Sequence, residues 1–123
     1  MAPHDLLRFA EMVRNFGAVG GHQIVPQGWI AEFRNFEDRA PWQRQQDGPR
    51  HFPDGSYRSK WYRTGLPDGE FAAIGIHGQW IWVNPTREVT IIRMASNNLP
   101  VDPDAGPMLR AAFDAVCRAF APA

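Results

Sequence analysis

The chain has 123 residues, and its 13 basic and 13 acidic side chains give a formal charge of zero. This length predicts a single domain over residues 1–123, and the charge balance argues against a nucleic-acid or membrane-surface protein that binds through bulk charge. One cysteine excludes an internal disulfide. The chain lacks a signal peptide and an apolar run that could span a bilayer, so we expect it to be cytoplasmic as written. A larger parent protein could be exported.

The N-terminal half is predicted to contain two helices and a long loop. Residues 5–16 have an apolar stripe at helical spacing, and a turn follows at residues 20–22. Residues 26–33 predict a short helix opened by Pro26, because proline is favoured in the first turn. Residues 34–57 are broken by proline and glycine, so we expect an irregular segment, partly held by Trp42 and Phe52.

The C-terminal half predicts antiparallel strands followed by a helix. Residues 57–63 indicate an outer strand, and residues 71–94 contain three apolar runs separated by turns, which is typical of a meander. The middle run, residues 79–83, is apolar at nearly every position, so both of its faces should be covered. Residues 108–120 predict the final helix. The expected fold class is α+β, with an antiparallel sheet of about four strands flanked by helices.

The chain offers no recognisable nucleophile. Its serines, Ser56, Ser59 and Ser96, lie in no Gly-x-Ser-x-Gly elbow, and none has a lysine three residues later because Lys60 is the only lysine. Cys117 lies on the apolar side of the final helix, where a buried structural thiol is expected. The histidines have no metal-ligand spacing, so we expect neither a metal site nor a cofactor.

Several polar and aromatic residues of the C-terminal half have two interpretations. His77 is either a turn residue satisfied by backbone or part of a cleft rim, and the first is favoured. Trp80 and Trp82 share one strand face, which forms either a ligand platform or core under a helix. The carboxylates near turns, Asp68, Glu70, Asp102 and Asp104, are expected to be solvated.

Gly75 and Gly78 indicate a site at the end of the first meander strand. Glycine at a strand end commonly marks close approach by a ligand or by other backbone, and a free backbone N–H there could donate to an oxyanion. A turn before Trp80 explains Gly78 fully and Gly75 less well.

The order of three stretches carries a family resemblance: the helix beginning at residues 5–9, residues 21–29, and residues 71–83 with Pro85 and the following strand. In this order they resemble the C-terminal part of serine hydrolases related to class C β-lactamases and penicillin-binding proteins. The chain is most similar to the branch of 6-aminohexanoate-dimer hydrolases and esterases. The resemblance implies part of a β-lactamase/transpeptidase-like fold, in which residues 34–57 reach towards the active-site mouth.

The resemblance also implies the chemistry of the site. The family hydrolyses amides or esters by acyl transfer to a serine, and its Ser-x-x-Lys and Tyr-x-Asn motifs lie upstream of the part that this chain resembles. The third motif matches Ile74-Gly75-Ile76 or, with a shifted alignment, His77-Gly78-Gln79. The first alignment is preferred, and it makes Gly75 the motif glycine and the Ile76 N–H one oxyanion donor. Ile74, His77 and Gly78 would form the cleft rim. The third motif lacks its lysine here, which favours ester or amide hydrolysis over antibiotic hydrolysis.

Two hypotheses follow. In the first, the chain is the C-terminal portion of such a hydrolase, inactive alone, with a small amide or ester as substrate once a complementing N-terminal polypeptide or self-association completes it. In the second, it is a stand-alone ligand- or partner-binding module without catalysis. A weaker third possibility is a small enzyme that uses His77 with a carboxylate. Neither nucleic acid nor membrane is expected as a partner.

Overall fold

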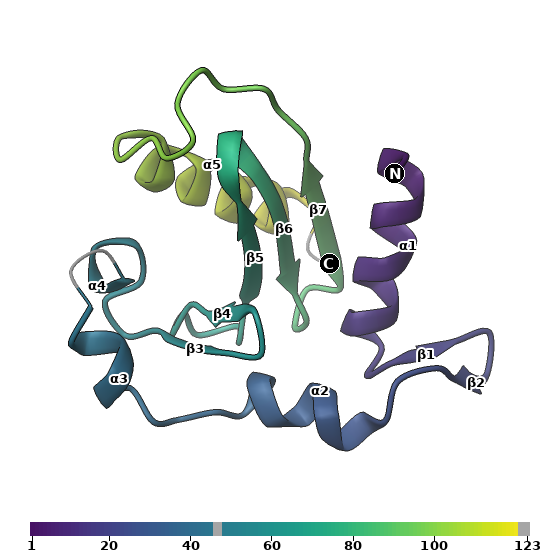
Figure 1. The fold of residues 1–123 in the computed structure, drawn as a ribbon. Helices are drawn as coiled ribbons and strands as arrows, with labels where there is room; N and C mark the ends of the chain where they lie inside the picture. Colours follow the sequence, from purple (N-terminus) through teal and green to yellow (C-terminus); the bar gives the residue numbers. More distant parts are fainter. Residues whose placement is uncertain (46–47, 121–123) are drawn as a thin grey trace.

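The computed structural model describes residues 1–45 and 48–120. Helices lie on both faces of a five-stranded antiparallel sheet with the order β3-β4-β5-β6-β7 (Figure 1). The elements are α1 (Pro3–Arg14), β1 (Ala18–Val19), β2 (His22–Gln23), α2 (Gln27–Arg34), α3 (Ala40–Gln43), α4 (Gly48–His51), β3 (Ser56–Arg58), β4 (Trp61–Arg63), β5 (Phe71–Gly75), a 3-10 turn (Ile76–Gly78), β6 (Gln79–Asn84), β7 (Val89–Arg93) and α5 (Ala105–Ala119).

The three main helices form where the apolar periodicity predicted them. Ala10 and Val13 of α1 are buried, and α2 begins directly after Pro26, as expected for a proline that opens a helix. The final helix begins at Ala105, earlier than the predicted residue 108. Asp102 explains part of this difference, since its carboxylate accepts a hydrogen bond from the Ala105 N–H in the first turn.

The prediction of one outer strand at residues 57–63 was wrong. The segment is a hairpin in which β3 and β4 pair, and Ser59 and Lys60 form the connection with φ of 53° and 73°. Two consecutive positive φ angles are typical of a tight hairpin turn, but glycine or asparagine usually supplies them. The Ser-Lys pair therefore gave no turn signal, and the sheet has five strands instead of about four.

The segment at residues 34–57 is more ordered than an irregular loop, although residues 46–47 lie outside the described part. It contains the short helices α3 and α4, and its residues Trp42 and Phe52 are buried. The Trp42 indole N–H donates a 2.8 Å hydrogen bond to the Phe52 carbonyl. This bond and the burial hold the two ends of the segment together, which confirms that Trp42 and Phe52 tie it down.

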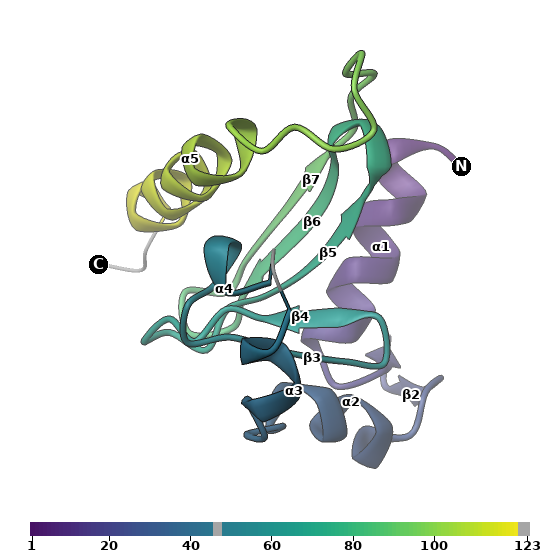
Figure 2. The same cartoon turned by 60° about the vertical axis from the view of Figure 1, so that its left-hand side comes forward.

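The core consists of two clusters separated by the sheet. On the face covered by α1 and α2, the cluster includes Phe33, Phe71 and Ile81, and on the α5 face it includes Trp82 and Phe113. Figure 2 shows the sheet between α1 and α5. Residues 80–84 of β6 are all buried, so the prediction that both faces of this strand are covered is confirmed.

The tryptophans of β6 belong to the core and do not form an exposed platform. Trp80 and Trp82 share one face, and their rings lie 5.6 and 5.5 Å from that of Phe113 on α5. Trp80 is 5% exposed and Trp82 is fully buried. The second interpretation of these residues, core under a helix, is therefore correct.

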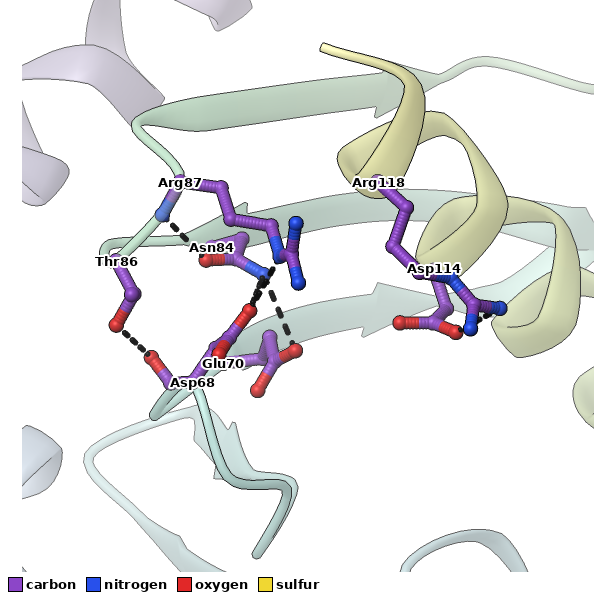
Figure 3. Close-up of polar contacts among 7 residues, drawn as sticks. All are labelled: Asp68, Glu70, Asn84, Thr86, Arg87, Asp114 and Arg118. Atoms are coloured by element: carbon purple, nitrogen blue, oxygen red, sulfur yellow. Dashed lines mark hydrogen bonds and ion pairs between the residues drawn. The ribbon is translucent and has the colours of Figure 1, made fainter. Parts of the chain in front are cut away.

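A buried polar cluster joins the start of β5 to the turn after β6 (Figure 3). The Asn84 side-chain N–H₂ donates to Asp68 at 3.0 Å and to Glu70 at 3.1 Å. Asp68 also accepts a 2.6 Å hydrogen bond from Arg87. Glu70 is only 3% exposed, which corrects the expectation that this carboxylate is solvated.

Candidate substrate pocket at the open edge of β5

A pocket of about 330 Å³ opens beside the C-terminal end of β5. Residues that are distant in sequence form its walls. They are Trp42, Gln45 and His51, the end of β5 with the following turn, residues of the 97–109 segment that leads into α5, and Tyr62 and Trp80 of the neighbouring strands. Four of the five predicted site residues line it, namely Ile74, Gly75, Ile76 and Gly78. The structure therefore gathers most of the predicted site around one cavity.

The pocket lies against a strand edge that has no strand partner. β4 pairs with β5 only at Phe71 and Ala72, whereas β6 pairs with β5 as far as Gly75. The Thr64 N–H donates to the Glu70 carbonyl, so the backbone groups of Glu70 point towards β4. Because these groups alternate along a strand, those of Ile74 point to the same side, beyond the end of β4. An extended ligand can hydrogen-bond there.

The alternation of backbone direction along β5 continues through Gly75. The Ile76 N–H is therefore expected on the same side as the backbone groups of Ile74. Gly75 has φ of −112° and ψ of 164°, which is ordinary extended backbone, so this position does not need glycine for its conformation. A Cβ here would lie 3.2 Å from that of Gln79, its cross-strand partner. Gly75 therefore reduces crowding at the pocket end of the hairpin, and the N–H of Ile76 faces the open edge.

The turn before Trp80 requires glycine at position 78, as predicted from the sequence. Its φ is 89°, and an added Cβ would lie 2.3 Å from the Arg93 guanidinium and 2.6 Å from the Asn97 amide. Arg93 in turn donates a hydrogen bond to the Gly78 carbonyl. The glycine thus lets two side chains close over the turn at one wall of the pocket.

His77 does not line the pocket, but it holds one of the pocket's walls in place. Its backbone N–H donates to the Pro100 carbonyl at 2.9 Å, and its carbonyl accepts from the Asn97 N–H at 3.1 Å. Its ring Nδ1 lies 2.8 Å from the Asn97 carbonyl, so Nδ1 carries the proton. His77 is therefore a positioning residue satisfied by backbone. The bond to a carbonyl gives no support to a catalytic pair of His77 with a carboxylate.

Other polar groups around the pocket come from Gln45, His51, Tyr62, Asn97 and Asp102. Burial raises the pKa of the Tyr62 phenol, and nearby Tyr57 raises it further, so the hydroxyl stays protonated at neutral pH. Asp102 is already engaged, because it accepts hydrogen bonds from the N–H groups of Asp104 and Ala105. The pocket thus presents hydrogen-bonding groups and aromatic surface around the strand edge.

The sequence alone did not identify these wall residues. Trp42 and His51 lie at least 20 residues before β5, and only the packing of the 34–57 segment brings them beside it. Gly106 on α5 is part of this packing, since a Cβ there would lie 2.7 Å from the His51 ring. One signal was present: the glycine in the first turn of α5, where a larger residue would have been better for the helix.

The described residues around the pocket include no serine, cysteine or lysine. Ser56 is buried, and its hydroxyl donates to the Phe36 carbonyl. Ser59 lies in the β3–β4 connection, and Ser96 is exposed on the loop after β7. Cys117 is buried under the sheet, and burial raises the pKa of its thiol, which agrees with a structural role.

The described part of the chain also contains no group of three or more histidine, cysteine, aspartate or glutamate side chains arranged to hold a metal ion. Within the same residues, no helix combines the length and apolar character needed to cross a membrane.

Two relatives share the sequence or the fold. A 6-aminohexanoate-dimer hydrolase from Paenarthrobacter ureafaciens is 33% identical over 92 residues, which are 75% of this chain and 23% of that protein. The solved structure of a "Putative 6-aminohexanoate-dimer hydrolase from Bacillus anthracis" matches with a TM-score of 0.76 at 21% identity, and it covers 96% of this chain and 29% of that one. No protein-family profile matches. The chain therefore spans about a quarter of the length of these relatives.

Proposed function

Because the chain is related in sequence and fold to 6-aminohexanoate-dimer hydrolases, we propose that it forms the substrate-binding side of an amide or ester hydrolase. The observation that carries this proposal is the open edge of β5, where Ile74 and Ile76 present backbone groups to a pocket. The ligand class is a small linear amide or ester, and the linear dimer of 6-aminohexanoate is the first candidate.

In the proposed reaction, a serine hydroxyl attacks the carbonyl carbon of the substrate and the carbonyl oxygen becomes an oxyanion. The Ile76 N–H donates one hydrogen bond to that oxygen, where the negative charge develops. Collapse of the intermediate expels the amine or alcohol, which takes a proton, and water then releases the acyl group from the serine. This chain contributes the oxyanion donor and the pocket walls.

The nucleophile belongs to a different part of the hydrolase in this proposal. The described residues around the pocket include no serine or lysine, and the three serines of the chain lie elsewhere. A Ser-x-x-Lys pair also needs a lysine three residues after a serine, which this sequence lacks. The chain alone is therefore the binding half of a site and is catalytically inactive.

An ester assay tests the missing nucleophile. The purified chain, mixed with a short-chain nitrophenyl ester, should release nitrophenol no faster than buffer. Turnover that is lost in Ser56→Ala or Ser59→Ala would show that the chain has its own nucleophile and would contradict the proposal.

A second function, ligand binding without catalysis, is favoured by one observation. The pocket is already formed by residues of this chain, with aromatic side chains from Trp42, Tyr62 and Trp80. Such a module would bind its ligand and need no complementing polypeptide. The genomic DNA distinguishes the two functions: a Ser-x-x-Lys coding region in frame upstream supports the hydrolase, and an independent start with its own ribosome site supports the module.

A further inference from the structure

The turn after β5 is fastened to the loop that follows β7. Figures 1 and 2 show the chain between β7 and α5 passing over the end of the β5–β6 hairpin. The His77 N–H donates to the Pro100 carbonyl at 2.9 Å, and the His77 carbonyl accepts from the Asn97 N–H at 3.1 Å. Gln79 adds a second link, because its side chain accepts from the Ala95 N–H at 3.1 Å and donates to the Ala95 carbonyl. The turn and the loop therefore hold one another.

Histidine is an uncommon residue for the backbone conformation at position 77. Its φ is 58° and its ψ is 24°, in the left-handed region where most side chains are strained. Glycine adopts this region without that strain, as Gly78 does in the next position with a φ of 89°. The backbone conformation alone therefore does not explain His77, and its ring must supply an interaction that glycine lacks.

The ring of His77 makes a further hydrogen bond to the same loop. Its Nδ1 donates to the Asn97 carbonyl oxygen across 2.8 Å. Since the Asn97 N–H is bonded to the His77 carbonyl, His77 engages both backbone groups of Asn97. A strained residue persists where several contacts fix it together, and these bonds are such contacts.

These hydrogen bonds of His77 act on its neighbour, Ile76. The Ile76 side chain is 63% exposed, so packing of that side chain does little to fix the backbone. Before Ile76, Gly75 is extended and pairs with Gln79 of β6. After Ile76, the His77 N–H is bonded to the loop. The backbone of Ile76 is therefore held between strand pairing on one side and the bonds of His77 on the other.

An oxyanion donor stabilises charge only when it points to the place where the charge develops. We propose that His77 sets the direction of the Ile76 N–H through its ring hydrogen bond to Asn97, and so acts as a positioning residue of the oxyanion site. Asn97 and Pro100 both line the pocket, so the same bonds keep the donor and this wall in one geometry. The inference rests on the proposed function, in which Ile76 is the donor.

Variants at position 77 test the ring hydrogen bond. Asparagine and aspartate have the same size and both tolerate the left-handed conformation, but only asparagine keeps an N–H that can replace Nδ1–H. His77→Asn should therefore preserve the direction of the Ile76 N–H. His77→Asp should change it, because a carboxylate would face the Asn97 carbonyl. His77→Gly removes the ring without straining the backbone and should behave like His77→Asp.

Glu88→Gly is the matched control. Glu88 also has a left-handed backbone, with a φ of 57°, and it lies in the turn at the other end of β6. Replacing it with glycine makes the same kind of change away from the pocket. We expect Glu88→Gly to leave both the Ile76 N–H and ligand binding as in the wild type.

The residual dipolar coupling of the Ile76 N–H, measured by NMR without ligand, reports the direction of this bond. It should match the wild type in His77→Asn and Glu88→Gly, and differ in His77→Asp and His77→Gly. Unchanged couplings in β6 show that each variant is folded. If His77 only supported the pocket wall, residues 97–101 would change and the Ile76 coupling would not. The two disruptive variants act differently, so either one decides the test if the other does not fold.

Titration with the linear dimer of 6-aminohexanoate measures the consequence for binding. His77→Asp and His77→Gly should bind the dimer at least about tenfold more weakly than the wild type, because a misdirected donor loses its bond to the carbonyl oxygen. His77→Asn should bind within about threefold of the wild type.

An unchanged Ile76 coupling in His77→Asp and His77→Gly would overturn the inference. Equal binding of the dimer by the wild type and these two variants would also overturn it, and the proposed function would stand. A wild type that does not bind the dimer would contradict the proposed function instead. The couplings measured without ligand would still decide whether His77 directs the Ile76 N–H.

Discussion

The Asn84 side chain donates a 3.1 Å hydrogen bond to Glu70 across the ends of β5 and β6, and Asn84 itself has no exposed surface. It also bonds to Asp68 and accepts from the backbone N–H of Arg87 (Figure 3). One buried amide therefore bonds to two carboxylates and to the turn that leads into β7.

Replacing this amide should strongly destabilise the fold. Asn84→Ala leaves the Glu70 carboxylate and the Arg87 N–H without these hydrogen-bond partners, so we expect the free energy of unfolding to fall by about 2–4 kcal/mol. Asn98→Ala, at an exposed loop position, should change it by less than about 0.5 kcal/mol. Urea unfolding followed by tryptophan fluorescence measures both. Equal effects of the two variants would show that the polar cluster has no structural role.

The two carboxylates of this cluster should have opposite effects on stability as pH changes. Burial raises the pKa of Glu70 above its ordinary value, so its ionisation costs stability as pH rises from that value through the folded-state pKa. Glu70→Gln should therefore gain stability over the wild type across that range and keep the gain above it.

Asp68 provides the matched comparison. Hydrogen bonds from Asn84 and Arg87 lower the pKa of Asp68, so its ionised form stabilises the fold above its ordinary pKa, and that stability is lost as pH falls through the folded-state pKa. Asp68→Asn should therefore be less stable than the wild type near neutral pH, and the difference should shrink in acid. Urea unfolding at a series of pH values measures both variants. Parallel pH profiles for Glu70→Gln and Asp68→Asn would contradict these assignments.

Gly78→Ala should destabilise the turn. Alanine would have to adopt a φ of 89°, so we expect a loss of about 1–2 kcal/mol in the free energy of unfolding, while the flexible ends of Arg93 and Asn97 move aside. Gly28→Ala is the control, because Gly28 lies in α2 with open space around it, and alanine there should be neutral or stabilising by up to about 1 kcal/mol. Urea unfolding compares them, and a neutral Gly78→Ala would show that the turn relaxes easily.

Periodic signals in the sequence predicted most of the fold. The helical stripes and the apolar run at residues 79–83 identified α1, α2, α5 and the meander, because burial against a sheet imposes regular spacing. The β3–β4 hairpin was missed because Ser59 and Lys60 adopt positive φ without a glycine signal. Such a turn is stabilised by strand pairing, which local sequence does not reveal.

The sequence predicted only the part of the candidate site that lies at the end of a single strand, β5. Gly75 and Gly78 stood out at the end of a strand, and both line the pocket. Trp42 and His51 come from another segment, and the His51 ring packs closely against Gly106 of α5. No local pattern encodes a contact over that sequence separation, so the pocket walls required the structure.

Cys117 should be unreactive in the folded chain. It is buried, and burial raises the pKa of its thiol, so little thiolate is present or accessible near neutral pH. We expect Ellman's reagent to label the native protein at least about a hundredfold more slowly than the protein in denaturing urea. The chain has no other cysteine, so the signal reports this residue alone. Rapid labelling of the folded protein would place the thiol on an accessible surface.

We propose that the open edge of β5 binds an acyl substrate through the Ile76 N–H without hydrolysing it. Ile76→Pro removes this N–H, and Gly75 already has the extended conformation that a residue before proline prefers. Ile76→Ala keeps the N–H and serves as the matched control.

The most direct measurement is an NMR titration of the chain with the linear dimer of 6-aminohexanoate. The account predicts shifts for the amides of Ile74, Gly75 and Ile76 in the wild type, the same binding by Ile76→Ala, weaker binding by Ile76→Pro, and no cleavage of the dimer. Shifts confined to other parts of the chain, equal binding by Ile76→Pro, or release of 6-aminohexanoate by the wild type would contradict it.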